Sequence, residues 1–471
     1  MLFNSFSFLV FFAVVLLLHR LPFGWTQKKV HLLLASYLFY AAWNPPFVAL
    51  LWISTAVDWQ VGRRLHESDD SRQRRRLVGL SLGVNLGLLA YFKYAGFVLE
   101  NFVWLVGQLG VDFNPAAPDI ILPLGISFYT FQTLSYTLSI YRRELKPADS
   151  LIDFALFVTF FPQLVAGPIV RATDFIVQLA KPVCANARQL GWGLALFNFG
   201  VFQKVVLSDT LLAPVADVVF AAPGRMGTVD AWVGTLAFSG QIFFDFAGYS
   251  ACAIGAALCL GFILPENFRC PYASLGFSDF WRRWHISLST WLRDYLYISL
   301  GGNRRGVTRT YVNLALTMLL GGLWHGASWN FVIWGALHGF YLIVERLLKA
   351  RFKDVSLFGS SAFKGLMYLS TFLAVTVTWI FFRAESLSGA LVLLQALFSD
   401  TQQRTLSSDQ VTTVLSLTLA MFVAQLALRN TDLERAFTRL PIFIKGPILA
   451  LPILILFAIP GDNRAFIYFQ F

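Results

Sequence analysis

The chain has 471 residues, of which 57% are hydrophobic and only 13% are charged, and its mean hydropathy is +0.62. A soluble domain carries about 25% charged residues, so this composition excludes an ordinary soluble protein and predicts a polytopic α-helical membrane protein. The formal net charge of +11 comes from basic residues that cluster in short loops between apolar runs, which is typical of cytoplasmic loops and argues against nucleic-acid binding. The four cysteines include no CxxC pair and no histidine at ligand spacing, so we expect no metal site and no disulfide framework.

Apolar runs close to the ~20 residues that cross a bilayer follow one another along the chain. We expect about eleven or twelve spanning helices in one integral-membrane domain, 1–471. Spans are expected at 6–18, 30–43, 47–61, 77–110 (with an interfacial piece), 120–141, 190–207, 231–262, 311–325, 331–348, 365–382, 411–428 and 448–459. The first run lacks a preceding basic region and a cleavage site, so it predicts a span rather than a cleaved signal peptide.

Basic loops predict which ends of the spans face the cytoplasm. The loop 63–76 holds six arginines, and a second basic loop, 301–309, precedes the later spans. A third basic run contains Lys349, Arg351 and Lys353. Because short cytoplasmic loops are enriched in Lys and Arg, we expect these loops on the cytoplasmic side and the N-terminus outside.

The apolar run 151–170 is interrupted by Phe161-Pro162-Gln163 and by Gly167-Pro168. Proline and glycine this close together break a helix, and broken backbone at membrane depth occurs only where it faces protein or a cavity. The run therefore predicts either a re-entrant segment or a single span with two ordinary kinks.

Asp245 is an isolated acid within the apolar run 231–262. An ionisable side chain at membrane depth is costly and is a functional candidate by default. Pairing with an arginine, or capping of a broken helix, is the alternative to a chemical role.

His285 lies in a stretch whose apolar and charged residues would fall on opposite sides of a helix. Plotted as one helix over 281–295, Trp281, Trp284, His285, Leu288, Leu292 and Tyr295 fall on one side, and Arg282, Arg283, Arg293 and Asp294 fall on the other. This pattern predicts an amphipathic in-plane or re-entrant helix with its histidine on the aromatic face. A histidine that is simply packed and hydrogen-bonded to backbone is the alternative.

His325 follows the basic loop at greater depth. Fourteen residues separate it from Tyr311, which corresponds to roughly 21 Å of helix in a hydrocarbon core ~30 Å thick. Gly321, Gly322 and Gly326 surround it and permit close backbone approach or an open helix end. A buried neutral imidazole can act as a general base.

These segments together resemble the membrane-bound O-acyltransferase family. The motifs that carry the similarity are FWRRWHISLSTWLRDYLY at 280–297, GGNR at 301–304 and LGGLWHG at 320–326. Within the family, the chain is more similar to the bacterial polysaccharide O-acetyltransferase branch. Supporting stretches are LLASYLFYAAW at 33–43, LPLGISFYTFQTLSYTLSIY at 122–141, FPQLVAGPIVR at 161–171 and FDFAGYS at 244–250. The resemblance extends from the N-terminus to about Glu385, and its core motifs lie in 120–348. In 386–471 we recognise only membrane helices that are not specific to the family.

The resemblance implies a helical ring around a tunnel in a bacterial inner membrane. It implies transfer of an acetyl group from cytoplasmic acetyl-CoA, with no bound cofactor, towards an exopolysaccharide such as alginate or cellulose. A periplasmic O-acetyltransferase or polysaccharide-modification protein is the implied partner. His325 matches the family's catalytic histidine and His285 the second histidine of this branch. Further candidates for the substrate site or tunnel are Trp284, Trp324, Asp245, Arg293, Asp294 and Asn303.

Other functions fit the same residues. A transporter that passes an acetyl group or a glycan would also need buried histidines and broken helices, although no inverted repeat is visible. Within the enzyme class, D-alanyl transfer to teichoic acid and O-acetylation of peptidoglycan are alternatives.

Overall fold

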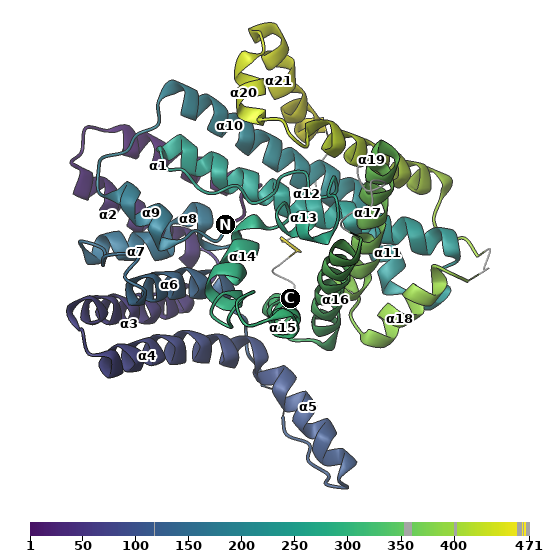
Figure 1. Cartoon of the computed structure of the whole chain (residues 1–471). Coiled ribbons are helices and arrows are strands. Elements are labelled where there is room, and N and C mark those ends of the chain that lie inside the picture. The colour runs from purple at the N-terminus through teal and green to yellow at the C-terminus, as the bar shows by residue number, and fades with distance from the viewer. Residues whose placement is uncertain (117, 353–359, 400–402, 459–463, 465, 468–471) are drawn as a thin grey trace. The chain divides into compact units, whose positions relative to one another are not determined.

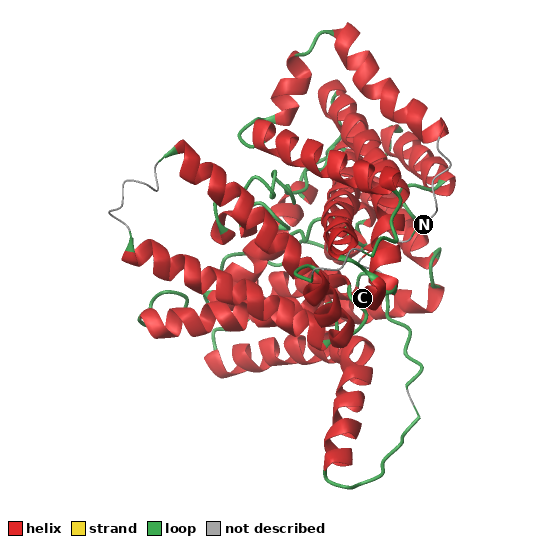
Figure 2. Ribbon diagram, turned by 90° about the vertical axis from the view of Figure 1, so that its right-hand side faces the viewer, coloured by secondary structure: helices red, strands yellow, loops and turns green. Residues whose placement is uncertain are grey.

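The computed structural model describes residues 1–471 except 117, 353–359, 400–402, 459–463, 465 and 468–471. Within the described residues every regular element is a helix and there is no strand (Figure 2). This confirms the all-α prediction. Lys353 of the third basic run and Ile459 at the end of the last predicted span lie outside the described residues.

The chain groups into two compact units, and the first comprises 1–194 and 253–265. Its helices are α1 (Phe6–Arg20), α2 (Trp25–Ala41), α3 (Val48–Glu67), α4 (Ser71–Leu89), α5 (Ala95–Gln108), α6 (Ile126–Tyr141), α7 (Leu151–Thr159), α8 (Phe161–Leu164) and α9 (Ala172–Leu179) (Figure 1). Two helices, α10 (Ala187–Phe202) and α12 (Thr228–Leu260), contribute residues to both units.

The second unit comprises 195–252 and 266–471 and contains both candidate histidines. Its helices are α11 (Ala213–Ala221), α13 (Phe277–Trp281), α14 (Ile286–Trp291), α15 (Val307–His325), α16 (Trp329–Arg351), α17 (Ser361–Arg383), α18 (Leu387–Ala396), α19 (Ser408–Leu428), α20 (Leu433–Arg439) and α21 (Ile442–Ala458). Two π-helical segments, η3 (Gln203–Leu212) and η5 (Leu292–Tyr297), also belong to it. That both units form a single domain stays a prediction.

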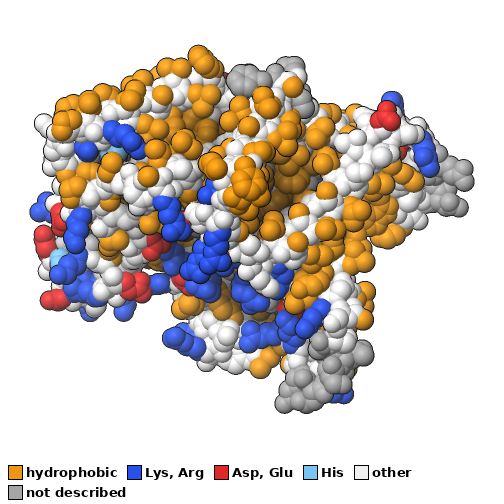
Figure 3. Space-filling model, turned by 90° about the horizontal axis from the view of Figure 1, so that it is seen from above, with side chains coloured by type: hydrophobic (Ala, Val, Ile, Leu, Met, Phe, Trp, Pro, Cys, Tyr) orange, Lys and Arg blue, Asp and Glu red, His pale blue; other side chains and the backbone are white. Residues whose placement is uncertain are grey.

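The outer surface is apolar in the way expected of a membrane protein. Five helical stretches in the described part of the chain are long and apolar enough to cross a bilayer: 71–108, 228–260, 329–351, 361–383 and 408–428. Large apolar side chains are exposed, Phe6 and Ile442 among them, and hydrophobic atoms cover much of the face in Figure 3. The chain is therefore a multi-pass membrane protein, and the larger number of eleven or twelve spans stays a prediction.

The interrupted run 151–170 is broken rather than kinked. Helix α7 ends at Thr159, the single turn α8 covers Phe161–Leu164, and the following residues as far as Val170 are not helical. Residues 153–170 are all buried, which agrees with the rule that broken backbone must face protein. The alternative of one continuous span with two kinks is wrong.

Helices α15 and α16 pack at very short range in the second unit. A Cβ on Gly322 would collide with the carbonyl oxygen of Phe331, and one on Gly335 would collide with that of Met318. Small residues at such a crossing let two backbones approach closely. The predicted close approach at Gly322 is confirmed, and it fixes the end of α15, where His325 lies.

Candidate active site

His325 is the last residue of α15 and is 4% exposed. The helix ends there because Gly326 adopts an extended backbone, and Ser328 then caps α16 by accepting a hydrogen bond from the Asn330 N–H at 3.2 Å. Three aromatic rings meet the imidazole edge to face with centroids 5.0–5.1 Å away, those of Trp324, Trp334 and Phe382. The histidine therefore lies at an open helix end inside an aromatic enclosure.

His285 lies where the predicted amphipathic helix breaks. The expected continuous helix over 281–295 is wrong: α13 ends at Trp281, α14 starts at Ile286, and His285 between them has a left-handed backbone with φ +42°. This region is uncommon for a residue with a side chain, although histidine enters it more readily than most. The polarity pattern nevertheless predicts burial for most of these residues, since Trp284, His285 and Leu288 are buried while Arg282 and Arg293 are exposed. Arg283 is the exception, because its side chain is only 13% exposed.

A hydrogen-bond network determines which nitrogen of His285 carries the proton. Asn267 Oδ1 accepts the backbone N–H of Ser287 at 3.3 Å and its hydroxyl at 2.8 Å, and it lies 3.0 Å from His285 Nδ1. Because the Ser287 N–H can only donate, the Asn267 atom that faces it must be the carbonyl oxygen. Nδ1 of His285 therefore donates to that oxygen, and Nε2 keeps its lone pair.

The environment keeps the His285 imidazole neutral. His285 lies outside the five candidate spans, is fully buried, and burial lowers its pKa to about 3. Its ring meets Phe246 of α12 edge to face at 4.6 Å. A neutral imidazole with Nδ1 protonated can accept a proton or a hydrogen bond at Nε2.

Trp324 joins the two histidines. Its indole lies 6.0 Å from the ring of His285 and 5.0 Å from that of His325. Trp284, the other predicted tryptophan, is fully buried and packs at 5.0 Å against both Phe268 and Trp379. The structure thus brings four of the predicted residues into one aromatic cluster.

The remaining predicted residues have other partners. Asp245 forms an ion pair with Lys204 and accepts a hydrogen bond from the backbone N–H of Ile467 at 2.9 Å. An ion-pair partner was expected for Asp245, but it is a lysine and not an arginine. Arg293 pairs with the adjacent Asp294 at 2.6 Å on the exposed side of η5. Asn303, in the 301–305 loop, accepts a hydrogen bond from the hydroxyl of Tyr297 at the end of η5.

Two residues of the cluster were not singled out from the sequence. Asn267 lies 18 positions before His285 in an irregular loop and carries no motif of its own. His338 is fully buried on α16, shares a hydrogen bond with the Thr378 hydroxyl at 3.2 Å, and its ring lies 4.7 Å from that of Trp334. Its spacing of four residues from Trp334, one helical turn, was the available signal.

The cluster provides two buried imidazoles within apolar walls, and a positioned imidazole can transfer a proton during acyl transfer. Within the described part of the chain no group of three or more His, Cys, Asp or Glu is placed to hold a metal ion. Residues 130–388 match the model of the membrane-bound O-acyltransferase (MBOAT) family. The chain belongs to this family.

Curated relatives extend the match beyond that segment. A probable alginate O-acetylase, AlgI, of Pseudomonas putida is 42% identical over 430 residues, which cover 91% of this chain and 87% of the relative. The protein of the same name from Pseudomonas aeruginosa is 43% identical, covering 85% and 75% of the two chains. A peptidoglycan O-acetyltransferase of Helicobacter pylori is 38% identical, covering 78% and 73%.

These similarities establish the class of enzyme. The chain is a multi-pass membrane O-acyltransferase, and the family match contains the whole histidine cluster described above. His285, Asn267, Trp324, His325 and His338 all lie between residues 130 and 388. The cluster is the natural candidate for the acyl-transfer site.

Proposed function

We propose that this MBOAT protein moves an acetyl group from cytoplasmic acetyl-CoA across the bacterial inner membrane for O-acetylation of an exopolysaccharide such as alginate or cellulose. Transfer takes place directly or through a periplasmic O-acetyltransferase or other polysaccharide-modification protein. The observation that carries the proposal is the pair of buried imidazoles linked by Trp324 within the family-matched segment. The relatives include alginate O-acetylases, which supports acetyl as the transferred group.

The chemistry assigned to His325 is removal of the acceptor hydroxyl proton. A hydroxyl is a weak nucleophile at neutral pH, and a positioned general base contributes typically 10²–10⁴-fold. As the hydroxyl oxygen bonds to the thioester carbonyl carbon, its proton passes to the His325 imidazole. The carbon–sulfur bond then breaks, the imidazolium returns the proton to the thiolate, and an ester and a free thiol result.

The chemistry assigned to His285 is positioning of a substrate. Its Nε2 lone pair accepts a hydrogen bond, while Asn267 holds Nδ1. A hydroxyl or an amide N–H of a substrate supplies the donor. The apolar walls formed by Trp324 and Phe246 exclude water that would otherwise hydrolyse the thioester.

The two substrates approach from opposite faces in this proposal. The basic loop 301–309 is predicted to face the cytoplasm, and α15 carries the chain from there to His325 over 19 residues, roughly 28 Å. Neither a nucleotide nor a sugar polymer dissolves in lipid, so each substrate needs its own passage to the histidines.

Purified protein, assayed in detergent and after reconstitution into vesicles, tests the proposal against a transporter that performs no chemistry. The protein is incubated with radiolabelled acetyl-CoA and acidic or neutral oligosaccharides, with and without a periplasmic partner protein. We expect labelled ester together with one equivalent of free CoA thiol. Movement of acetyl-CoA or glycan across a vesicle membrane without ester formation would contradict an enzyme. Deletion of the gene identifies the polymer, because that polymer then lacks acetyl esters.

A further inference from the structure

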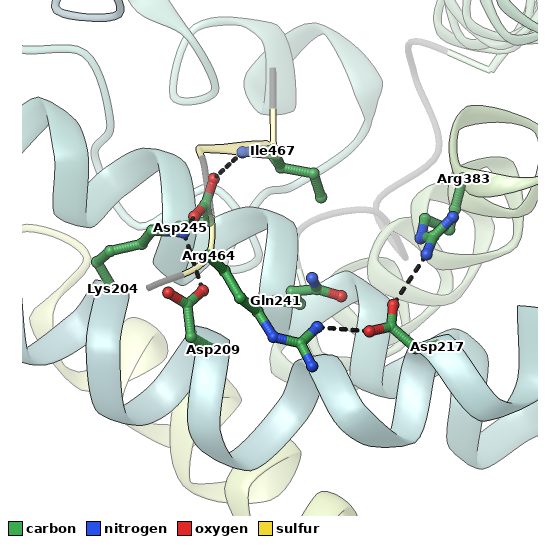
Figure 4. Close-up of a pocket in the computed structure, with 8 residues that line it drawn as sticks. All are labelled: Lys204, Asp209, Asp217, Gln241, Asp245, Arg383, Arg464 and Ile467. Atoms are coloured by element: carbon green, nitrogen blue, oxygen red, sulfur yellow. Dashed lines mark hydrogen bonds and ion pairs between the residues drawn. The ribbon is translucent and has the colours of Figure 1, made fainter. Parts of the chain in front are cut away.

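The second unit contains a pocket of about 190 Å³ whose basic side chains face carboxylates (Figure 4). Lys204 lies 2.9 Å from Asp209 Oδ1 and also pairs with Asp245. Arg383 donates to Asp217 Oδ1 at 2.8 Å. Because Lys204 and Arg383 are engaged in these ion pairs, they are not available to a negative charge that develops in the histidine cluster.

Trp334 joins His325 to His338 within that cluster. It lies on α16, is 1% exposed, and its ring meets that of His325 edge to face at 5.1 Å. The His338 ring, one helical turn further along α16, lies 4.7 Å from the same indole. Because the rings of His325 and Trp334 are in contact, a small group bound against this side of His325 also touches the indole.

Three buried ring nitrogens around this contact have no hydrogen-bond partner among the described residues. They are Nε1 of Trp334, Nε1 of Trp281 and Nδ1 of His338. The Trp281 ring lies 5.8 Å from that of Trp334 and 5.1 Å from that of His338. An indole N–H can only donate, and a buried donor without an acceptor destabilises a protein. The site therefore favours a ligand that presents an oxygen atom to these donors.

The acyl carbonyl oxygen is the reacting atom that gains negative charge during acyl transfer. When the acceptor hydroxyl oxygen bonds to the carbonyl carbon, its proton passes to His325 and one electron pair of the C=O bond moves to the carbonyl oxygen. When the C=O bond forms again, the carbon–sulfur bond breaks and the thiolate takes the proton. Neutral N–H donors aimed at that oxygen stabilise the intermediate, most strongly where water is excluded.

The imidazole of His325 and the indole of Trp334 are close enough to act on one reacting group. A general base acts at about 2.6–3.2 Å from the atom that carries the proton, and an oxyanion donor at about 2.7–3.1 Å from the oxyanion. In the tetrahedral intermediate, the attacking oxygen and the oxyanion are bonded to the same carbon. Ring centroids 5.1 Å apart therefore allow the imidazole to reach one oxygen and the indole N–H the other.

We propose that Trp334 is a catalytic residue whose indole N–H stabilises the oxyanion that forms on the transferred acyl group. The same N–H binds the carbonyl oxygen of the thioester before the reaction, and the hydrogen bond strengthens as negative charge develops. The proposal rests on the proposed acetyl transfer, because it assigns a donor to the carbonyl group that is transferred.

Replacement of Trp334 tests this role by steady-state kinetics. Trp334→Phe keeps an aromatic ring and removes the N–H, and we expect kcat to fall about 10²-fold, the loss typical of one oxyanion donor. The KM for the acyl donor should change little, because the interaction is strongest in the transition state. Benzothienylalanine at position 334, in which sulfur replaces the N–H and the shape is kept, should give the same loss if Trp334→Phe fails to fold.

Trp379→Phe is the matched control for the loss of indole volume. Trp379 is fully buried, and in the described chain its ring contacts are with Trp334, Trp284 and Phe382 rather than with a histidine. This variant should keep a kcat near that of the unmodified protein. Equal losses in Trp334→Phe and Trp379→Phe, or an unchanged kcat in a folded benzothienylalanine variant, would overturn the proposal.

Infrared spectroscopy of a bound ketone provides a readout that a purely structural role would not move. The probe is an analogue of acetyl-CoA in which a methylene group replaces the thioester sulfur and the carbonyl carbon carries an isotope label. A donor to the carbonyl oxygen weakens the C=O bond, so its stretching frequency should be lower in the unmodified protein than in either Trp334 variant. Equal frequencies in these proteins would contradict a hydrogen bond from Trp334.

The two measurements together separate this proposal from the proposed function. Acetyl transfer that proceeds at an unchanged rate without the Trp334 N–H would overturn the role of Trp334 and leave the enzyme intact. A carbonyl frequency that depends on the Trp334 N–H, in a protein that transfers no acetyl group to any acceptor, would overturn the proposed function instead.

Discussion

Asn267 provides a direct way to perturb His285 without changing the imidazole itself. Replacing Asn267 with Ala removes the oxygen that accepts His285 Nδ1–H and both donors of Ser287, together with the amide group that donates to the Ser250 hydroxyl at 3.0 Å. The two serine hydroxyls can rotate towards other partners. The His285 Nδ1–H and the Ser287 backbone N–H cannot, so two buried donors lose their acceptor.

The magnitude follows from these two orphaned donors. Each costs about 1–3 kcal/mol when left unsatisfied in a buried site, so Asn267→Ala should lower the free energy of unfolding by about 2–6 kcal/mol. The effect on turnover arises because His285 no longer has one fixed tautomer and orientation. Loss of the groups that orient metal-bound histidines lowers affinity or activity about 10–100-fold, and we expect a fall in kcat of similar size here.

The assay compares Asn267→Ala with Asn267→Asp, using acetyl transfer at saturating donor and thermal unfolding in detergent. The Asp variant keeps an acceptor for both fixed donors, so it should be more active than the Ala variant. Its carboxylate stabilises the imidazolium and raises the pKa of His285. His285 acts in its neutral form, so activity is lost when acidification protonates it. Because its pKa is higher in the Asp variant, that variant should lose activity at a higher pH than the unmodified protein. A folded Asn267→Ala protein with unchanged kcat and pH profile would refute the role given to Asn267.

Three further predictions address His285, the topology and the helix crossing. His285→Gln, which places a hydrogen-bonding group near the position of Nε2, should keep more activity than His285→Ala; complete loss in both variants would argue for a direct acid–base role. Single cysteines at Ser71 and Thr308, introduced with the exposed Cys184 replaced by Ser, should both react with an impermeant reagent only from the cytoplasmic side; labelling of either one from outside alone would contradict the topology. Gly322→Ala should lower stability by about 1–3 kcal/mol through overpacking against the α16 backbone, and an unchanged unfolding temperature would contradict the close approach.

Much of the site could be predicted because polarity and glycine spacing act locally. Trp284 and His285 are buried and Arg293 is exposed, as the helical plot predicts, even though the backbone is broken between α13 and α14. His325 ends α15 beside Gly326, where the glycines indicated an open helix end. In each of these cases the residue type alone determines burial or helix termination.

The rest depends on contacts between residues far apart in the chain. Asn267 has no periodicity or motif, and only tertiary packing places its oxygen against His285 and Ser287. Asp245 pairs with Lys204 on η3 rather than with an arginine, and this contact joins two segments that are far apart in the sequence. The left-handed backbone of His285 is likewise invisible in a plot that assumes one regular helix.

The measurement that tests the central claim most directly is acetyl transfer by purified His325→Ala protein. If His325 is the base that deprotonates the acceptor hydroxyl, transfer should fall by about 10²–10⁴-fold. The variant should still fold and bind acetyl-CoA with near-normal affinity, because the nucleotide end of the donor is proposed to bind near the cytoplasmic basic loops, away from the imidazole. A folded His325→Ala protein that binds acetyl-CoA and acetylates at near the unmodified rate would contradict the account.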